Sequence, residues 1–369
     1  MTTALAQTPL HEWHVAQGGR MVEFGGWSMP IQYGSIVDEH RATRRAVGLF
    51  DISHMGRLRF NGDNAGQFLD TLVTRRVDNL MPGRIRYGVV CNDDGGCLDD
   101  VLVYRLDGHR GPYHLMVVNA SNRGKIVRWI DRHIDGFGDV QFEDATSEWA
   151  MIAVQGPQAL GLVKPLLDFD PAELKYYTGR ESKIGSAGVI VSRTGYTGED
   201  GCELIVPAEF ATELWQSLLD AGSAVGATPV GLAARDTLRL EAAMPLYGHE
   251  LSEEITPVQA GLDFAIDMEG REFHGRDALI RVQSDPGLPR RVGLECPGRR
   301  VPREQYLILS EDREVGYVTS GTFSPTFEKP IAMGYVAVEA SHPGTELSIQ
   351  VRGRGEPARV VELPFYKRK

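Results

Sequence analysis

The chain has 369 residues, which is enough for two or three domains and for a hydrophobic core that needs no disulfide or metal support. Its 42% hydrophobic and 24% charged residues exclude wholesale disorder, and its formal charge of −11 argues against a general nucleic-acid binder. The sequence shows no membrane-spanning run, secretory signal or transit peptide, and its four cysteines lack zinc or disulfide spacing. We therefore expect a cytoplasmic protein without a metal site.

The first part of the chain predicts a compact α+β unit over about residues 55–140. Turn clusters separate short β-strands that are expected at 89–90, 101–104 and 113–118. Apolar residues then recur at helical spacing over 119–134, with Asn119 or Ser121 as the expected cap of that helix.

The middle of the chain continues to mix both kinds of element. Strands are expected at 149–155, 189–193 and 203–206, and helices at 158–163, 210–222 and 227–240. After about residue 279, short strand candidates follow one another at regular spacing, at 291–294, 306–309, 315–319, 331–338, 347–351 and 359–363. This spacing is typical of a small all-β barrel or jelly-roll, so a domain boundary is expected near 275–285.

Several common catalytic signatures are missing from the sequence. There is no GxSxG elbow, Walker A loop, HExxH helix or GxGxxG turn after a strand. Serine hydrolases, P-loop nucleotidases, zincins and Rossmann dehydrogenases therefore lose their best evidence.

Three segments are candidates for chemistry, and each also has a purely structural interpretation. The run NDDGGCLDDV at 92–101 is either a hairpin turn with solvated acids or the start of a strand. In the strand, Asp99 and Asp100 point to opposite faces, so one carboxylate turns inward, where it needs a partner. An inward carboxylate could hold a cation or orient a nucleophilic nitrogen.

The second segment is SRTGYTGEDGCE at 192–203, which is either a tight β connection or a binding loop. In the second interpretation, Tyr196 supplies an aromatic wall, and the carboxylate of Glu203 accepts two N–H bonds from a heterocycle.

The third segment is the helix-like GLAARDTLRLE at 231–241, where Arg235 and Arg239 share one face. It is either a solvated charged helix or the site of an arginine that meets a carboxylate-bearing ligand. The lone histidines His54 and His249 are expected to be packed or capping residues. The residues alone thus indicate a three-domain α+β protein with a candidate site for an anionic aromatic ligand, and they name no reaction.

Long motifs nevertheless occur in order over nearly the whole chain. They are TPLHEWH (8–14), MVEFGGWSMPIQY (21–33), GLFDISHMG (48–56), GGCLDD (95–100), MVVNASN (116–122), QGP (155–157), SRTGYTGEDG (192–201), GLAARDTLRLEA (231–242), PLYGHEL (245–251), TSGTFSP (319–325) and PFYKRK (364–369). Together they resemble the aminomethyltransferase family, the T-proteins of the glycine cleavage system.

The resemblance implies a fold of three domains in a cloverleaf with a folate channel at the centre. The expected domains are a discontinuous folate-binding α+β region (1–50 and 145–275), a ferredoxin-like α+β domain (51–144) and a C-terminal β jelly-roll or barrel (276–369). The implied reaction moves the methylene of an S-aminomethyldihydrolipoyl group from lipoylated H-protein to the co-substrate tetrahydrofolate. Its products are 5,10-methylenetetrahydrofolate, ammonia and dihydrolipoyl H-protein.

The resemblance also implies roles for individual residues. Asp100, the second aspartate of the DD pair, matches a catalytic carboxylate that hydrogen-bonds near N10 of the folate and helps N5 to attack the methylene. The residues that match folate-binding positions are Tyr87, Asn119, Tyr196, Glu203, Arg235 and, with a looser alignment near the C-terminus, Tyr366 and Lys367. Two alternatives share the fold: a folate-dependent demethylase and a non-catalytic folate-binding protein.

Overall fold

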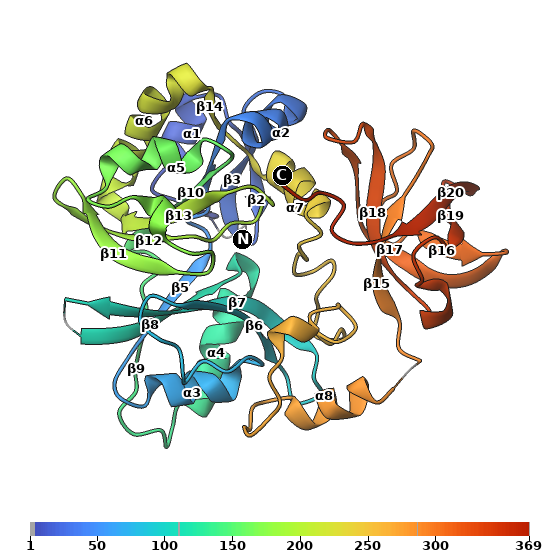
Figure 1. Cartoon of the computed structure of the whole chain (residues 1–369), viewed down its shortest axis with the longest axis horizontal. Coiled ribbons are helices and arrows are strands. Elements are labelled where there is room, and N and C mark those ends of the chain that lie inside the picture. Colours follow the sequence, from blue (N-terminus) through green and yellow to red (C-terminus); the bar gives the residue numbers. More distant parts are fainter. Residues whose placement is uncertain (1–3, 110, 286, 369) are drawn as a thin grey trace. The chain divides into compact units, whose positions relative to one another are not determined.

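The structure is a computed structural model that describes residues 4–109, 111–285 and 287–368 (Figure 1). The chain forms two compact units, each of which is discontinuous in sequence. The first unit consists of Met1–Gly88, Asp100–Gly195 and Glu199–Arg235. The second consists of Val89–Asp99, Tyr196–Gly198 and Asp236–Lys369.

A six-stranded sheet forms one half of the first unit. Its strands, in spatial order, are β11 (Gly179–Ile184), β12 (Ala187–Ser192), β13 (Gly201–Pro207), β10 (Trp149–Gln155), β4 (Val47–Asp51) and β14 (Ala227–Pro229). Helices α5 (Ala159–Val163) and α6 (Ala211–Gly222) pack on this sheet (Figure 1). On α6, Leu214, Trp215 and Leu218 recur at helical spacing, and all three are buried in the core against the sheet.

The N-terminal segment forms a small three-stranded sheet in the order β1 (Ala6–Gln7), β3 (Trp27–Gln32) and β2 (Arg20–Phe24). In the chain, helix α1 (His11–Ala16) lies between β1 and β2, and helix α2 (Ile36–Arg45) follows β3. A buried polar cluster ties this segment to β4. Asp51 accepts a hydrogen bond from the Thr8 hydroxyl at 2.6 Å, and its Oδ2 lies 2.9 Å from Nε2 of His14. These bonds satisfy a carboxylate that would otherwise be costly to bury.

A five-stranded antiparallel sheet forms the other half of the first unit. Its order is β6 (Ile85–Cys91), β7 (Cys97–Gly108), β8 (Gly111–Val118), β5 (Gly56–Asn61) and β9 (Gln141–Asp144), and the tip of the β6–β7 hairpin belongs to the second unit. Helices α3 (Ala65–Leu72) and α4 (Arg123–His133) lie along this sheet (Figure 1). The residues of α4 that are buried, Ile126 and Ile130, are one helical turn apart.

The second unit contains a closed barrel. Its strands pair in the order β15 (Arg290–Glu295), β18 (Lys329–Val336), β17 (Arg313–Ser324), β16 (Leu307–Ser310), β19 (Glu346–Val351) and β20 (Arg354–Val361). Helix α8 (Arg276–Gln283) precedes the barrel, and helix α7 (Leu232–Glu241) crosses from the first unit into the second. Buried side chains that include Leu294, Ile308 and Ile349 fill the barrel interior.

The structure confirms the mixed α and β fold class and the C-terminal barrel that turn spacing predicted. Two local expectations are wrong. The helix expected at 227–240 begins at Leu232, because residues 227–229 pair with β4 as strand β14. Asn119 and Ser121 do not cap α4: its N-cap residue is Asn122, which makes no side-chain cap bond. The three-domain boundaries inferred from the resemblance stay a prediction.

Candidate functional site

Asp100 lies on strand β7, and both of its carboxylate oxygens accept hydrogen bonds. The amide of Asn119 donates to Oδ1 at 2.8 Å, and the phenol of Tyr87 donates to Oδ2 at 3.2 Å. The register explains the first bond. Leu102 pairs with Val117 in the antiparallel β7–β8 ladder. Asp100, two residues before Leu102, therefore faces Asn119, two residues after Val117.

Burial and these hydrogen bonds act in opposite directions on the pKa of Asp100. Burial raises the pKa, whereas the bonds from Asn119 and Tyr87 lower it, and the net result is a pKa above the ordinary aspartate value. A carboxyl group of this kind keeps its proton to higher pH than an exposed aspartate, which suits a group that moves a proton.

The two aspartates of the DD pair have different surroundings. Asp99 is fully buried, whereas Asp100 is half-buried and is the one held by Asn119 and Tyr87. The amide of Asn119 also donates to the backbone carbonyl of Asp100, at 3.3 Å. Asn119 stands at the N-cap position of a 3₁₀ turn (Ala120–Asn122) that precedes α4, and its side chain makes no cap bond there.

Glu203 lies on β13, with only 5% of its surface exposed. The hydroxyl of Thr194 donates to its Oε2, and the Thr194 hydroxyl is in turn 2.9 Å from that of Ser192. Tyr104 extends this chain, with its phenol 3.4 Å from the Ser192 hydroxyl. The carboxylate is therefore oriented by a row of hydroxyl groups, from Thr194 in the loop after β12, Ser192 at the end of β12 and Tyr104 on β7.

Burial is also the largest influence on the pKa of Glu203. Burial raises this pKa, while the Thr194 hydrogen bond and the positive charge of Arg235 lower it, and the net pKa lies above the ordinary glutamate value. Arg235 is half-buried near the start of α7. Its charge also acts on His54, whose pKa is lowered to about 3, first by burial and then by Arg235.

The phenol of Tyr177 is influenced electrostatically by both carboxylates. Burial raises the pKa of its phenol, and the negative charges of Glu203 and Asp100 raise it further. Both carboxylates thus lie within electrostatic reach of one phenol. Tyr177 has a positive φ of 57°, a conformation that is uncommon for a bulky residue. Its carbonyl accepts the backbone N–H of Ile85 at 3.0 Å, which holds this segment beside β6.

The second unit brings Tyr196 and Tyr366 to the C-terminal end of α7. The phenol of Tyr196 donates to the carbonyl of Pro245, and the backbone N–H of Tyr366 donates to the carbonyl of Glu241 at 2.8 Å. Gly198 packs against the same end of α7, and a Cβ there would lie 3.0 Å from the Cβ of Ala242 and 3.5 Å from the ring of Tyr366. The contact with Ala242 would be tight, and the positive φ of 81° also favours glycine.

Comparison with known proteins decides the family. A model of the GCVT N-terminal domain matches residues 10–270, and one of the glycine cleavage T-protein C-terminal barrel domain matches residues 290–367. The aminomethyltransferases of Symbiobacterium thermophilum and Moorella thermoacetica are 44% and 45% identical to this chain. Those alignments cover 100% and 99% of this chain, and 99% and 98% of the two relatives. The chain belongs to the glycine cleavage T-protein family.

A solved structure of the same family agrees with this assignment. The glycine cleavage system aminomethyltransferase T from Bartonella henselae superimposes with a TM-score of 0.90 at 35% identity, over 98% of both chains. The family resemblance seen in the motifs, the fold class and the expectation of an aminomethyltransferase are thereby confirmed.

The charged helix segment 231–241 of this chain is only partly exposed to solvent. Arg239 and Glu241 on α7 are both buried, so the interpretation of 231–241 as a solvated face is wrong for them. His54 is packed, as expected, with its ring edge-on to Phe24. His249 is half-exposed and contacts the carbonyl of Thr319 at 3.3 Å.

The part of the chain that the structure describes was compared with the requirements of a metal site and of a membrane span. Within residues 4–109, 111–285 and 287–368, no cluster of three or more His, Cys, Asp or Glu side chains is arranged to hold a metal ion. In the same ranges, none of the helices has the length and apolar character needed to cross a membrane.

Sequence reasoning did not find several residues that surround the two carboxylates. Thr194 and Ser192 lie in the SRTGYTGEDG motif, where the glycines, Tyr196 and Glu203 drew attention instead. A hydroxyl two residues from Tyr196 could have been noticed as a donor to a buried carboxylate. The sequence around Tyr177 contains no motif that predicts its proximity to Asp100.

Proposed function

We propose that this chain transfers the methylene carbon of an S-aminomethyldihydrolipoyl group, presented by a lipoylated H-protein, to tetrahydrofolate. The carbon exchanges its bonds to sulfur and to the amino nitrogen for bonds to N5 and N10 of the folate. The two N–H protons of the folate end on ammonia and on the dihydrolipoyl thiol, so atoms and charges balance. The products are 5,10-methylenetetrahydrofolate, ammonia and dihydrolipoyl H-protein.

The observation that carries this proposal is a pair of carboxylates in the first unit, Asp100 and Glu203, each of which is oriented by hydrogen bonds from neighbouring side chains. Asp100 and Glu203 both have raised pKa values, and both act on the pKa of Tyr177. A reaction that moves two protons while holding a heterocycle needs one group that exchanges protons and one that accepts N–H bonds. The different surroundings of the two carboxylates support this division of roles.

Glu203 suits the amino-pyrimidine edge of the pterin. The Thr194 hydroxyl donates to Oε2, and an ionised carboxylate has further lone pairs on both of its oxygens. The carboxylate therefore keeps acceptor capacity for two parallel N–H groups of the ring. Thr194 fixes its orientation before the ligand arrives, which reduces the entropy cost of binding.

Asp100 is the proposed catalytic residue. Near N10, its carboxylate would accept a proton from the folate. This would help N5 to attack the methylene as ammonia leaves. Asn119 and Tyr87 hold both of its oxygens, so the group is positioned before substrate binds. A positioned acid or base of this kind typically contributes about 10² to 10⁴ in rate.

The remaining folate-binding residues are proposed from the family motifs. Tyr87 and Asn119 act on Asp100 through the hydrogen bonds described above, and Arg235 supplies a positive charge close to Glu203. Tyr196 and Tyr366 belong to the second unit, where each is fixed by a hydrogen bond to or from the α7 end and the loop after it. We assign all five to tetrahydrofolate binding.

The test is a reconstituted reaction of the full chain with aminomethyl-loaded H-protein and tetrahydrofolate, following ammonia and 5,10-methylenetetrahydrofolate together. Stoichiometric release of both, dependent on H-protein, is expected. Turnover with a small sulfonium or N-methyl donor but not with H-protein would instead indicate a folate-dependent demethylase. Folate binding without any turnover would indicate a non-catalytic folate-binding protein.

A further inference from the structure

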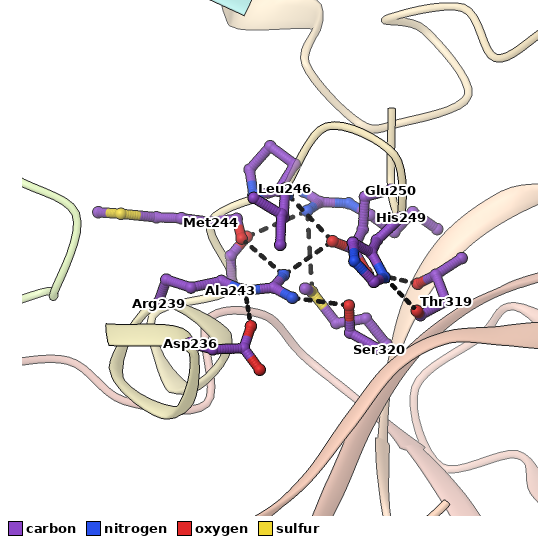
Figure 2. A network of polar contacts seen from close by, with 12 residues as sticks. Asp236, Arg239, Ala243, Met244, Leu246, His249, Glu250, Thr319 and Ser320 are labelled. Atoms are coloured by element: carbon purple, nitrogen blue, oxygen red, sulfur yellow. Dashed lines mark hydrogen bonds and ion pairs between the residues drawn. The ribbon is translucent and has the colours of Figure 1, made fainter. Parts of the chain in front are cut away.

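Arg239 is a buried cation, and each of its three guanidinium nitrogens donates a hydrogen bond (Figure 2). Nε donates to Asp236 at 2.8 Å, Nη1 to Glu250 at 2.7 Å and to the Met244 carbonyl at 3.2 Å, and Nη2 to the Ser320 hydroxyl at 2.7 Å. The guanidinium thus joins helix α7, the loop that follows it and barrel strand β17.

Glu250 is the anionic partner, and none of its surface is exposed. Its Oε2 also accepts the backbone N–H of Leu246 at 3.0 Å, and its Oε1 accepts the Thr319 hydroxyl at 2.6 Å. Burial alone would raise the pKa of Glu250, but the charge of Arg239 and its hydrogen bonds hold it below the ordinary value. The ion pair is therefore charged, and its hydrogen bonds compensate for desolvation.

The ion pair fixes a short stretch of backbone on both sides of Pro245. Arg239 binds the carbonyl of Met244, just before this proline, and Glu250 binds the N–H of Leu246, just after it. The carbonyl of Pro245 is the group that accepts the phenol of Tyr196. Where the Tyr196 hydroxyl lies therefore depends on backbone that Arg239 and Glu250 hold.

A buried ion pair is a poor way to gain stability alone, because an apolar pair of similar volume is often at least as stable. What the ion pair can provide is a defined geometry, because a planar guanidinium binds several acceptors at fixed angles. Here the guanidinium binds the Met244 carbonyl on one side of Pro245, and its partner Glu250 binds the Leu246 N–H on the other side.

We propose that Arg239 and Glu250 are positioning residues, which hold the Pro245 carbonyl in place and thereby set the position of the Tyr196 ring. This inference rests on the proposed function, because it takes Tyr196 to be part of the tetrahydrofolate site. Neither Arg239 nor Glu250 touches substrate in this scheme. They act on folate binding through Tyr196 alone, and not on binding of the H-protein.

The experiment is a kinetic double-mutant cycle with the full chain, using Arg239→Lys, Tyr196→Ala and the double variant. Lysine keeps the charge beside Glu250 but cannot bond Met244, Glu250 and Ser320 together. Arg239→Lys is expected to raise KM for tetrahydrofolate about tenfold and to leave KM for aminomethyl-loaded H-protein unchanged. In the Tyr196→Ala background the same change is expected to alter KM for tetrahydrofolate by less than about twofold.

A matched control separates positioning from general loss of stability. Leu294→Ala opens a cavity in the barrel core of the same unit and makes no change near Pro245. It is expected to lower Tm at least as much as Arg239→Lys and to leave KM for tetrahydrofolate unchanged. Should Arg239→Lys not fold, Ser320→Ala leaves the guanidinium in place but removes the Ser320 hydrogen bonds to Arg239 and Glu250, and it is expected to raise the same KM by a smaller factor.

The possible outcomes separate this inference from the function beneath it. If Tyr196→Ala raises KM for tetrahydrofolate but Arg239→Lys and Ser320→Ala do not, the positioning role is wrong and the proposed site stands. Equal effects of Arg239→Lys with and without Tyr196 would also overturn it. If Tyr196→Ala itself leaves that KM unchanged, the assignment of Tyr196 to the folate site fails, and the inference fails with it.

Discussion

The amide of Asn119 donates to Oδ1 of Asp100 at 2.8 Å across the β7–β8 pair. Because backbone pairing fixes the separation of the two strands, this bond gives the carboxylate the rigidity of the sheet. Asn119 precedes a 3₁₀ turn, and its side chain caps neither that turn nor α4. Its amide binds the carboxylate on the neighbouring strand instead.

Asp100→Asn is expected to reduce kcat by about 10² to 10⁴ while tetrahydrofolate affinity changes only a few fold. The amide is nearly isosteric with the carboxyl group but cannot exchange a proton. Single-turnover formation of 5,10-methylenetetrahydrofolate and a separate folate titration measure the two quantities. Asp94→Asn on the exposed hairpin tip is the control and should behave like wild type. Wild-type turnover in Asp100→Asn would mean that the catalytic assignment is wrong.

Asn119→Ala is expected to shift the pH–rate profile to higher pH. The Asn119 bond lowers the pKa of Asp100, so its loss leaves burial less opposed and raises that pKa further. Because the deprotonated carboxylate accepts the folate proton, activity should appear at higher pH than in wild type. Measuring kcat over the pH range checks this. Ser121→Ala, at an exposed position of the same segment, should leave the profile in place.

Glu203 predicts a pH dependence of folate binding. In the free protein its pKa is raised by burial, and the pterin N–H groups bind the charged form. Below that pKa, binding must therefore release a proton, so affinity rises with pH until the free protein is fully ionised and then becomes constant. Calorimetry in buffers of different ionisation enthalpy measures the released proton.

The matching variant for this prediction is Glu203→Gln. It keeps the shape of the side chain and removes its charge change, so tetrahydrofolate binding should become weaker and independent of pH over the same range. Binding of wild type that weakens as pH rises would have the wrong sign and would exclude Glu203 as the pterin acceptor.

Much of the architecture could be predicted from the sequence because it depends on local patterns. The regular alternation of short apolar runs and turn residues after residue 279 predicted the barrel, which is closed by six strands. Helical spacing predicted α6, whose Leu214, Trp215 and Leu218 are buried on one side. At 227–229 the same reasoning failed, because parallel pairing with β4 outweighed the helical continuation.

The site was less predictable because its contacts join residues that are distant in sequence. Nothing local brings Tyr177 near Asp100 and Glu203, and the residue type does not indicate its positive φ. The motifs pointed to Asp100 and Glu203, but not to the hydroxyl row that orients Glu203. Tyr177 and Thr194 lie outside the strands, so neither strand alternation nor local spacing predicts where their side chains lie.

Asp51→Asn is expected to destabilise the fold by about 3 kcal/mol near neutral pH, because it breaks a fully buried hydrogen-bonded pair with His14. Burial would raise the pKa of Asp51, but the bonds to His14, Thr8 and Ser53 lower it from 3.8 to about 2. The folded state therefore favours the ionised form. The resulting stability is present above pH 3.8 and is lost as pH falls toward 2.

Urea unfolding of wild type and Asp51→Asn between pH 2 and pH 7 tests this (the pH values span the two pKa values of Asp51). The difference in midpoint should be largest near neutral pH and should shrink below pH 3.8, since acid protonates Asp51 in wild type too. Asp170→Asn, which removes an exposed pair with Lys164, should change the midpoint little at any pH. A difference that stays constant down to pH 2 would show that packing around Asp51, and not its charge, supports the N-terminal segment.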